Sequence, residues 1–361
     1  MGGQERMIGD SVAGGGRAAS VAATGRDDRI VGQDRIDAAR ALIVGKVHRT
    51  PMLSSATAAT MVESRTGGRL GDGRIYLKAE HLQKTGSFKP RGMTARVAVL
   101  TSAERERGII TFSAGNAAQG YAYAGAALGV PVTVVMPAAA NPMKVAATRG
   151  YGADVVLEGD HIGEVLEAMN RIRAERNLVL CHPYDDPDVI AGHASTGLEI
   201  LEDVPDVDVI VVGIGGGGLI SGVAAAVKER RPGVRVYGIE PEGSNAMSVA
   251  LKAGIPVPIV PRSVADGLNG PVAGEWTLAM VQRYVDDVIL ITDDVILAGL
   301  RFSLERTKQL LEPAGAAALA ALLAGLIPLR DGDRVCAVLS GGNVDLGRLG
   351  ELLSPAGPAP R

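Results

Sequence analysis

Residues 207–219 read Val-Asp-Val-Ile-Val-Val-Gly-Ile-Gly-Gly-Gly-Gly-Leu, an apolar run that ends in a glycine-rich loop. A near-continuous run of valine and isoleucine predicts a parallel strand that is covered on both faces. The segment from Leu219 to Arg230 predicts a helix directly after the loop. A strand, a glycine loop and a helix in this order indicate an α/β fold whose ligands bind beyond the carboxyl ends of the strands.

The same pattern occurs twice more. Ser113-Ala114-Gly115-Asn116 follows the predicted strand 108–112, and Ser340-Gly341-Gly342-Asn343 follows the predicted strand 334–339. Strands and helices alternate along the chain, which predicts a doubly wound α/β architecture. The other predicted strands are 74–79, 130–136, 154–157, 178–182, 208–213, 235–239 and 288–291. The predicted helices are 36–47, 117–128, 142–149, 162–176, 190–202, 219–230, 293–311 and 315–324.

A lysine occupies an unusual place upstream of these loops. In Gly86-Ser87-Phe88-Lys89-Pro90-Arg91-Gly92, Lys89 lies between an aromatic ring and a proline, in a predicted loop bounded by glycines. A lysine that forms a Schiff base with a carbonyl cofactor needs an amine desolvated enough to lose its proton. By itself the heptapeptide also fits a solvated turn from which the lysine reaches into water.

Together and in this order, the four motifs resemble the fold-type II family of pyridoxal phosphate enzymes, in particular the threonine/serine dehydratases (ammonia-lyases), with serine racemases as relatives. The resemblance runs from about Ile36 to Leu353 and includes the phrases His48-Arg49-Thr50-Pro51, Ala265-Asp266-Gly267-Leu268 and Glu312-Pro313-Ala314-Gly315. It implies a tryptophan synthase beta-like fold, with two doubly wound parallel-sheet domains of which the smaller is inserted in the larger.

The resemblance also implies domain boundaries. We expect a large cofactor-binding domain made of residues 35–100 and 183–353, and a small domain of residues 101–182. Residues 1–34 are rich in Gly, Ala, Arg and Asp, which predicts a disordered tail. Residues 354–361, with three prolines, are expected to form a frayed C-terminus.

The resemblance implies a role for each motif, with pyridoxal 5'-phosphate as the cofactor. Lys89 matches the Schiff-base lysine, which after release acts as general base at the substrate Cα. Phe88 would pack against the pyridine ring, and Ser340 would face the pyridine nitrogen. The phosphate-binding loop corresponds to Gly215, Gly216, Gly217, Gly218 and Leu219, where glycine N–H groups and a helix N-terminus face an anion.

The substrate carboxylate would be held by the loop of Ser113, Ala114, Gly115 and Asn116. Asn116 also matches the position that hydrogen-bonds the 3'-oxygen of the cofactor. Taken by itself, this tetrapeptide also fits a helix N-cap.

The expected activity is elimination of the β-hydroxyl of L-threonine, with L-serine as a second substrate, to give a 2-oxo acid and ammonia. A neutral hydroxyl at Ser340 cannot hold the pyridine nitrogen protonated, which favours prompt loss of a β-substituent. Serine racemases carry a second serine where this chain has Ala114. Racemisation therefore has no obvious acid here, although serine racemase and β-hydroxyaspartate ammonia-lyase activities stay open as alternatives.

Two departures from the family put the exact substrate in doubt. Most dehydratases carry His where this chain has Ala117, and Ala191-Gly192-His193-Ala194-Ser195-Thr196 replaces a commoner Gly-Gln-Gly-Thr-like phrase. Both segments are expected near the pocket. His182 and His193 are expected to be core or cap residues rather than ligands.

Two interpretations other than an ammonia-lyase also stay open. Gly213-x-Gly215-x-x-Gly218, with Glu240 after the next strand, fits the dinucleotide pattern of a nicotinamide-dependent oxidoreductase. That reading leaves the lysine and asparagine loops unexplained. A degenerate, non-catalytic binding protein is disfavoured because the residues of all these motifs are present, namely Lys89, Ser113, Asn116 and Ser340.

Glu240 is the candidate metal ligand, because it lies where some relatives bind a divalent cation. The segment from Glu240 to Ser248 offers few carboxylates for a hard ion. A monovalent cation held by carbonyl oxygens stays open.

Composition limits the partners. The chain has 361 residues and a net charge of −3, and 3% of it is aromatic, so nothing suggests nucleic acid or an anionic membrane as a partner. No apolar run is long enough to predict a membrane span. Two cysteines, Cys181 and Cys336, are expected to be buried free thiols, in keeping with a cytoplasmic protein. A homo-oligomer, dimer or tetramer, is what the resemblance implies.

The metabolic setting follows from the resemblance too. Threonine deamination suggests isoleucine biosynthesis, but the sequence ends soon after Asn343, so we expect no C-terminal regulatory domain. A catabolic or unregulated role follows as a hypothesis.

Overall fold

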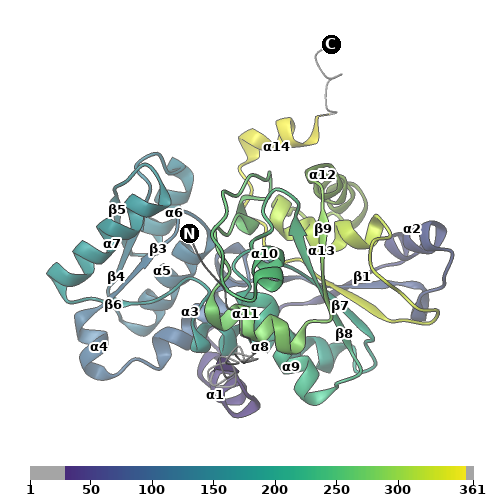
Figure 1. Ribbon diagram of the computed structural model, residues 1–361, viewed down its shortest axis with the longest axis horizontal. Coiled ribbons are helices and arrows are strands. Elements are labelled where there is room, and N and C mark those ends of the chain that lie inside the picture. The colour runs from purple at the N-terminus through teal and green to yellow at the C-terminus, as the bar shows by residue number, and fades with distance from the viewer. Residues whose placement is uncertain (1–28, 355–361) are drawn as a thin grey trace, which may run out of the picture.

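The computed structural model describes residues 29–354, which form two β-sheets that lie side by side (Figure 1). The larger sheet has six strands in the order β1-β2-β10-β7-β8-β9, and all neighbours are parallel except β1 with β2. Its strands are β1 (Met52–Ser55), β2 (Ile75–Lys78), β7 (Val209–Gly213), β8 (Arg235–Pro241), β9 (Asp287–Ile291) and β10 (Val335–Val338).

The smaller sheet has four parallel strands in the order β5-β4-β3-β6. They are β3 (Ile109–Phe112), β4 (Val132–Met136), β5 (Asp154–Leu157) and β6 (Val179–Leu180). All four lie between β2 and β7 in sequence, so the smaller sheet is inserted in the larger unit. The predicted α/β fold class is confirmed, whereas the exact boundaries at residues 101 and 182 stay a prediction.

Helices cover both faces of the larger sheet, and strand side chains alternate between them. Ile210 and Val212 of β7 pack in the core beneath α1 (Gln33–Ile43), α8 (Pro187–Asp203), α9 (Gly218–Arg230) and α11 (Glu275–Tyr284). Val209 and Val211 pack on the other face against α2 (Ala56–Thr66), α12 (Asp293–Phe302) and α13 (Pro313–Leu323). This double burial explains the unbroken apolar sequence of the strand.

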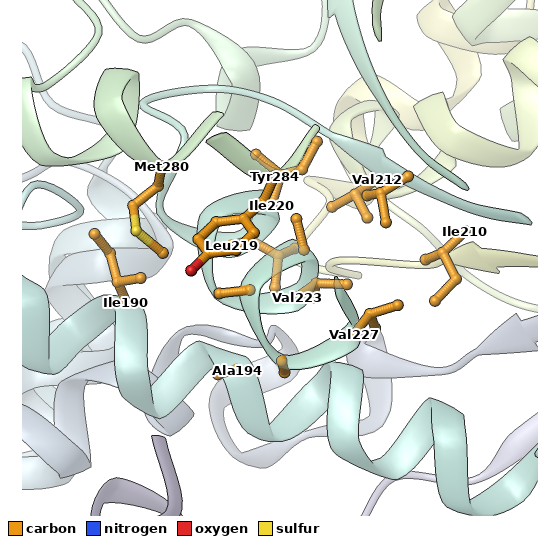
Figure 2. Packing of buried hydrophobic residues seen from close by; sticks show 14 of the residues in the cluster. Ile190, Ala194, Ile210, Val212, Leu219, Ile220, Val223, Val227, Met280 and Tyr284 are labelled. Atoms are coloured by element: carbon orange, nitrogen blue, oxygen red, sulfur yellow. The ribbon is translucent and has the colours of Figure 1, made fainter. Parts of the chain in front are cut away.

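The helix after the glycine loop is anchored in the first of these cores. Leu219, Ile220 and Val223 of α9 pack among side chains of α8, α11 and β7 (Figure 2). Burial of three such side chains contributes roughly 1.5–3 kcal/mol each. The N-terminus of α9 is therefore held rigidly at the end of β7.

The smaller sheet is packed in the same two-sided way. Ile109 packs against α3 (Lys89–Ala98), α5 (Asn116–Leu128) and α6 (Pro142–Gly150), whereas Ile110 packs against α7 (Ile162–Arg176). Helix α3 contacts both α5 and α8, so it lies between the two sheets. The remaining helices are α4 (Ser102–Arg107), α10 (Ala246–Ala253) and α14 (Leu346–Leu353).

Two local features differ from the sequence predictions. Lys89 does not lie in a loop but begins helix α3, with Pro90 in the first turn, where its missing N–H costs nothing. The helix predicted over 293–311 ends at Phe302, and a single π-helical turn (Ser303–Thr307) follows. The Ser303 hydroxyl donates to the Gly299 carbonyl, a side-chain bond that bends helices.

The predicted N-terminal tail falls largely outside the described residues, as do residues 355–361. The described part begins earlier than predicted, because Val31 is buried and its N–H donates to Met280 Sδ at 3.2 Å. Gln33 and Asp34 already belong to α1.

The two cysteines are buried and unpaired, as predicted. Cys181 packs in the core of the smaller sheet, and Cys336 lies on β10 in the core of the larger one. Within residues 29–354, no helix has the length and apolarity needed to cross a bilayer.

Candidate active site

One cavity of about 420 Å³ lies between the two sheets and collects all the predicted site residues except Glu240. Its lining includes Phe88, Lys89, Ser113, Ala114, Gly115, Asn116, Gly215, Gly216, Gly217, Gly218, Leu219 and Ser340. The volume is typical of a small-molecule site. Motifs from three strand ends and the start of α3 therefore meet at one place, as expected at the carboxyl edge of parallel sheets.

Lys89 contributes its amine to the lining of this cavity. Its Nζ donates to the Pro183 carbonyl at 3.0 Å and lies 5.0 Å from the centre of the Phe88 ring. Burial lowers the pKa of Lys89 to about 8, and the carboxylate of Glu312 partly opposes that shift. About a tenth of the amine is therefore unprotonated at pH 7, far more than for a lysine with the ordinary pKa, and nucleophilic attack on a carbonyl requires this unprotonated form.

The glycine loop exposes its backbone to the cavity. Gly217 has φ +94°, in the left-handed region that favours glycine, and a Cβ at Gly216 would overlap the ring of Tyr184. The first hydrogen bond of α9 runs from Ser221 N–H to the Gly217 carbonyl, so the preceding N–H groups have no partner within the helix. Unpaired N–H groups at a helix N-terminus suit a phosphate.

Asn116 connects the two sheets beside the cavity. Its Nδ2 donates to Glu312 Oε1 at 2.7 Å, and its Oδ1 accepts from Asn343 Nδ2 at 2.8 Å. Asn343 Nδ2 also donates to the Thr85 carbonyl. The side chain of Asn116 is thus held in one orientation at the start of α5, between β3 and α13.

Glu312 is a site residue that sequence reasoning missed. The side chain is buried in the cavity wall, and burial together with the charge of Asp266 raises its pKa to about 8. Its phrase Glu-Pro-Ala-Gly carried the family resemblance, yet it was given no role. The available signal was a glutamate directly before the Pro-Ala-Gly that opens the predicted helix 315–324.

Tyr184 was also missed. It belongs to the segment that crosses from the smaller sheet to α8, and its hydroxyl donates to the Val272 carbonyl at 2.9 Å. The neighbouring Pro183 supplies the carbonyl that holds Lys89. No sequence pattern marks these two residues, because their position depends on how the crossover segment lies over the glycine loop.

The two segments in which the sequence departs from the family lie in different positions relative to the cavity. Ala117 lines the cavity, whereas His193 is fully buried behind Phe88, with ring centroids 4.7 Å apart. His193 Nδ1 accepts the N–H of Gly92 at 3.1 Å, so it satisfies a donor in the first turn of α3. The histidine is a cap and core residue, as the sequence analysis expected.

Glu240 lies away from this cavity. Its carboxylate accepts from the N–H groups of Met247 and Ser248 and from the Ser248 hydroxyl, at 2.7–2.9 Å. It therefore serves the N-terminus of α10. Among residues 29–354, no group of three or more His, Cys, Asp or Glu side chains could hold a metal ion. The metal role of Glu240 stays a prediction without added support.

Comparison with known proteins identifies the class. A family model described as pyridoxal-phosphate dependent enzyme matches residues 46–341, and the chain belongs to that family. Pyridoxal phosphate is the cofactor, and the unpaired N–H groups, the glycine backbone and the buried amine fit it. The dinucleotide interpretation of the glycine loop is therefore wrong.

The relatives are enzymes of amino-acid metabolism. The chain is 42% identical over 309 residues to an L-threonine ammonia-lyase of Thermotoga maritima, covering 85% of this chain and 74% of that protein. It is 38% identical to the catabolic L-threonine dehydratase TdcB of Escherichia coli K12, covering 90% and 97%. Maize serine racemase has a similar structure, with a TM-score of 0.83, 35% identity and coverage of 89% and 96%.

Proposed function

We propose that this chain is an L-threonine ammonia-lyase, a dehydratase that converts L-threonine to 2-oxobutanoate and ammonia and L-serine to pyruvate and ammonia. The observation that carries the proposal is the amine of Lys89, buried and with a lowered pKa, in one cavity with an anion-binding glycine loop and the asparagine loop. The similarity to threonine ammonia-lyases and dehydratases supports the choice of substrate.

The residues of the cavity divide the work of holding the cofactor. Gly215 to Leu219 would bind the phosphate, Phe88 would lie against the ring, and Ser340 would face the pyridine nitrogen. The Ser340 hydroxyl is buried, and its hydrogen bond to the Ala314 carbonyl is long at 3.4 Å, so the hydroxyl can give up this weak bond and donate to an unprotonated pyridine nitrogen. Bound pyridoxal phosphate supplies an electron sink for the substrate Cα.

Lys89 is the residue proposed to move the proton at Cα. Its amine is the only lysine nitrogen that the described structure places beside both Phe88 and the Pro183 carbonyl. With a pKa of about 8 it accepts a proton near neutral pH and returns it in the same turnover.

The substrate carboxylate is proposed to lie on the loop from Ser113 to Asn116, at the N-terminus of α5. Glu312 is held by Asn116 through Oε1, which leaves Oε2 to carry the proton that its raised pKa retains. A protonated carboxyl there adds no second negative charge beside the bound carboxylate.

Two alternatives from the same family are less well supported. A serine racemase needs an acid on the opposite face of Cα, and the position expected to supply it is Ala114. A β-hydroxyaspartate ammonia-lyase needs a cation free to bind a second carboxylate. The nearby cation of the cavity, Lys144, already pairs with Asp266.

We also propose a cytoplasmic homo-oligomer, dimer or tetramer, and a catabolic rather than an isoleucine-biosynthetic role. Two buried unpaired thiols support a reducing compartment, and TdcB is a catabolic relative. Light scattering of the purified protein gives the oligomeric state. Activity that L-isoleucine leaves unchanged supports the catabolic role, and strong inhibition contradicts it.

The function is tested with purified protein, pyridoxal phosphate and L-threonine, by recording the visible absorbance band and 2-oxobutanoate together. Lys89→Ala should abolish the band and lower product formation by at least about a thousandfold, because both nucleophile and base are lost. Lys84→Ala, in the same segment but outside the cavity, is the matched control. A band without 2-oxobutanoate keeps the cofactor and rejects threonine.

A further inference from the structure

Few charged side chains line the cavity. Among the described residues that line it, Lys89 and Lys144 are the only cations, and Asp266 and Glu312 the only carboxylates. Lys89 is committed to the cofactor. Lys144 is thus the one cation of the lining that could bind a charged group on the substrate side chain.

Lys144 is not free, because Asp266 neutralises it. Lys144 Nζ lies 2.5 Å from Asp266 Oδ2, with 29% of the lysine side chain and 46% of the aspartate side chain exposed. Lys144 belongs to α6 of the smaller sheet, and Asp266 to the loop between α10 and α11 of the larger unit. The ion pair therefore joins the two walls of the cavity.

In a bound substrate, the amino-acid side chain would lie next to the ion pair of Lys144 and Asp266. If the α-carboxylate lies on the loop from Ser113 to Asn116 of the smaller unit, the β-substituent extends into the rest of the cavity, where the larger unit contributes Asp266, Gly267 and Leu268 to the lining. The hydroxyl and methyl groups of threonine bring no charge there. A second carboxylate would meet the charge of Asp266 and find Lys144 already paired, and like charges in close contact repel each other.

We propose that Asp266 is a specificity-determining residue that holds Lys144 and so excludes substrates with an acidic side chain. The proposal rests on the proposed function and adds to it: the accepted class is neutral β-hydroxy amino acids, and L-threo-3-hydroxyaspartate is the rejected analogue. Specificity here comes from the repulsion between the Asp266 carboxylate and an acidic substrate rather than from a contact with threonine. In a variant that accepts L-threo-3-hydroxyaspartate, the same elimination would give oxaloacetate and ammonia.

The test is the ratio of kcat/KM for L-threo-3-hydroxyaspartate to kcat/KM for L-threonine in the holoenzyme. Asp266→Asn keeps the shape of the side chain, removes its charge and leaves the Lys144 ammonium available, so the ratio should rise at least about tenfold. Asp266→Ala, which introduces no new hydrogen bond, should raise it as well. Adding Lys144→Gln to Asp266→Asn should return the ratio toward that of the wild type.

Asp345→Asn is the matched control. Asp345 Oδ2 accepts from Asn141 Nδ2 across the same two units, but its side chain lies outside the substrate cavity. The substitution removes one negative charge from the neighbourhood and should leave the ratio unchanged. An equal rise in this variant, or no rise in Asp266→Asn, overturns the proposal, as does a wild type that uses both substrates equally well.

A binding measurement separates this proposal from the proposed function. L-Aspartate and L-asparagine have the same size, differ by one charge and carry no β-hydroxyl, so each is titrated into the holoenzyme and followed by visible absorbance. The wild type should bind L-asparagine more tightly, and Asp266→Asn should reverse that preference. A wild type that releases no 2-oxobutanoate rejects threonine as substrate, while an unreversed preference rejects the role of Asp266.

Discussion

Burial in one cavity shifts the pKa values of Glu312 and Lys89 toward each other. Burial disfavours charge on both side chains, so the carboxyl pKa rises and the amine pKa falls, each to about 8. The carboxylate of Glu312, when ionised, favours the charged form of Lys89. Such convergence marks a site where a proton is exchanged near neutral pH.

Glu312→Gln removes that negative charge, so the pKa of Lys89 should fall below about 8. The measurement is the rate at which the apoprotein captures pyridoxal phosphate, followed by visible absorbance against pH. Because only the unprotonated amine reacts, the midpoint of this profile should move to lower pH in the variant. Glu305→Gln, an exposed glutamate on the π-helical turn, is the control and should keep the wild-type midpoint.

Glu312 also makes stability depend on pH in a defined direction. Its pKa in the folded protein lies above its usual value, so the folded state binds more protons than the unfolded state between about pH 4.5 and 8. The free energy of unfolding should therefore decrease as pH rises through this window. Urea denaturation of the apoprotein at pH 5 and pH 8 measures the decrease, which Glu312→Gln should reduce; an unchanged decrease would show that Glu312 is not its source.

Gly216 illustrates how a single missing Cβ shapes the site. A methyl group there would overlap the Tyr184 ring, so Gly216→Ala must displace the crossover segment that also holds Lys89. Overpacking of this kind costs about 1–3 kcal/mol, and the dissociation constant for pyridoxal phosphate should rise about tenfold to a hundredfold. Gly150→Ala, where a Cβ meets nothing within 4 Å, should leave the constant unchanged.

At the scale of an element, helix α3 is fixed by a buried network of charges. Arg91, two residues after Lys89, is fully buried and forms hydrogen bonds with the carboxylates of Glu80 and Glu199 at 2.7–2.8 Å. Lys78 donates to Glu199 as well. These contacts hold the first turn of α3 against the β2 segment and α8. They therefore fix the backbone of Lys89, whose amine lines the cavity.

Arg91→Met should destabilise the protein by about 3–5 kcal/mol, because it leaves two carboxylates buried without their cation. The free energy of unfolding from urea denaturation is the measurement. Arg171→Met breaks ion pairs with Glu158 and Glu175 that solvent screens, so it should leave the free energy of unfolding almost unchanged. Equal losses in the two variants would contradict the role given to burial.

Elements with a strong local pattern were predictable. The strand 209–213 and the glycine loop after it combine an apolar run with glycines, and both were found from sequence. The sequence predicts a loop where α3 begins, because Pro90 and Gly92 are poor helix formers and the packing that overrides them is tertiary. The break after Phe302 depends on side-chain bonds of Ser303 and Thr307 to backbone carbonyls, which periodicity does not show.

At the scale of the whole molecule, the site is built from segments that are distant in sequence. Each loop that follows a strand could be predicted, because parallel strands bring their carboxyl ends to one edge. Glu312, Lys144 and Asp266 could not be placed, because their positions depend on how the two sheets face each other. The substrate-facing charges are therefore a property of the assembled chain rather than of any motif.

The two buried thiols give each half of the molecule its own reporter of opening. Cys181 lies in the core of the smaller sheet and Cys336 in that of the larger, and burial raises the pKa of each to about 12. Alkylation therefore requires local or global opening at each site. Pulse labelling at increasing urea concentrations, read by peptide mass spectrometry, gives the concentration at which each cysteine becomes exposed. If both are labelled at the same concentration, the two sheets unfold as one cooperative unit. If Cys181 is labelled at a lower concentration, the inserted sheet opens first.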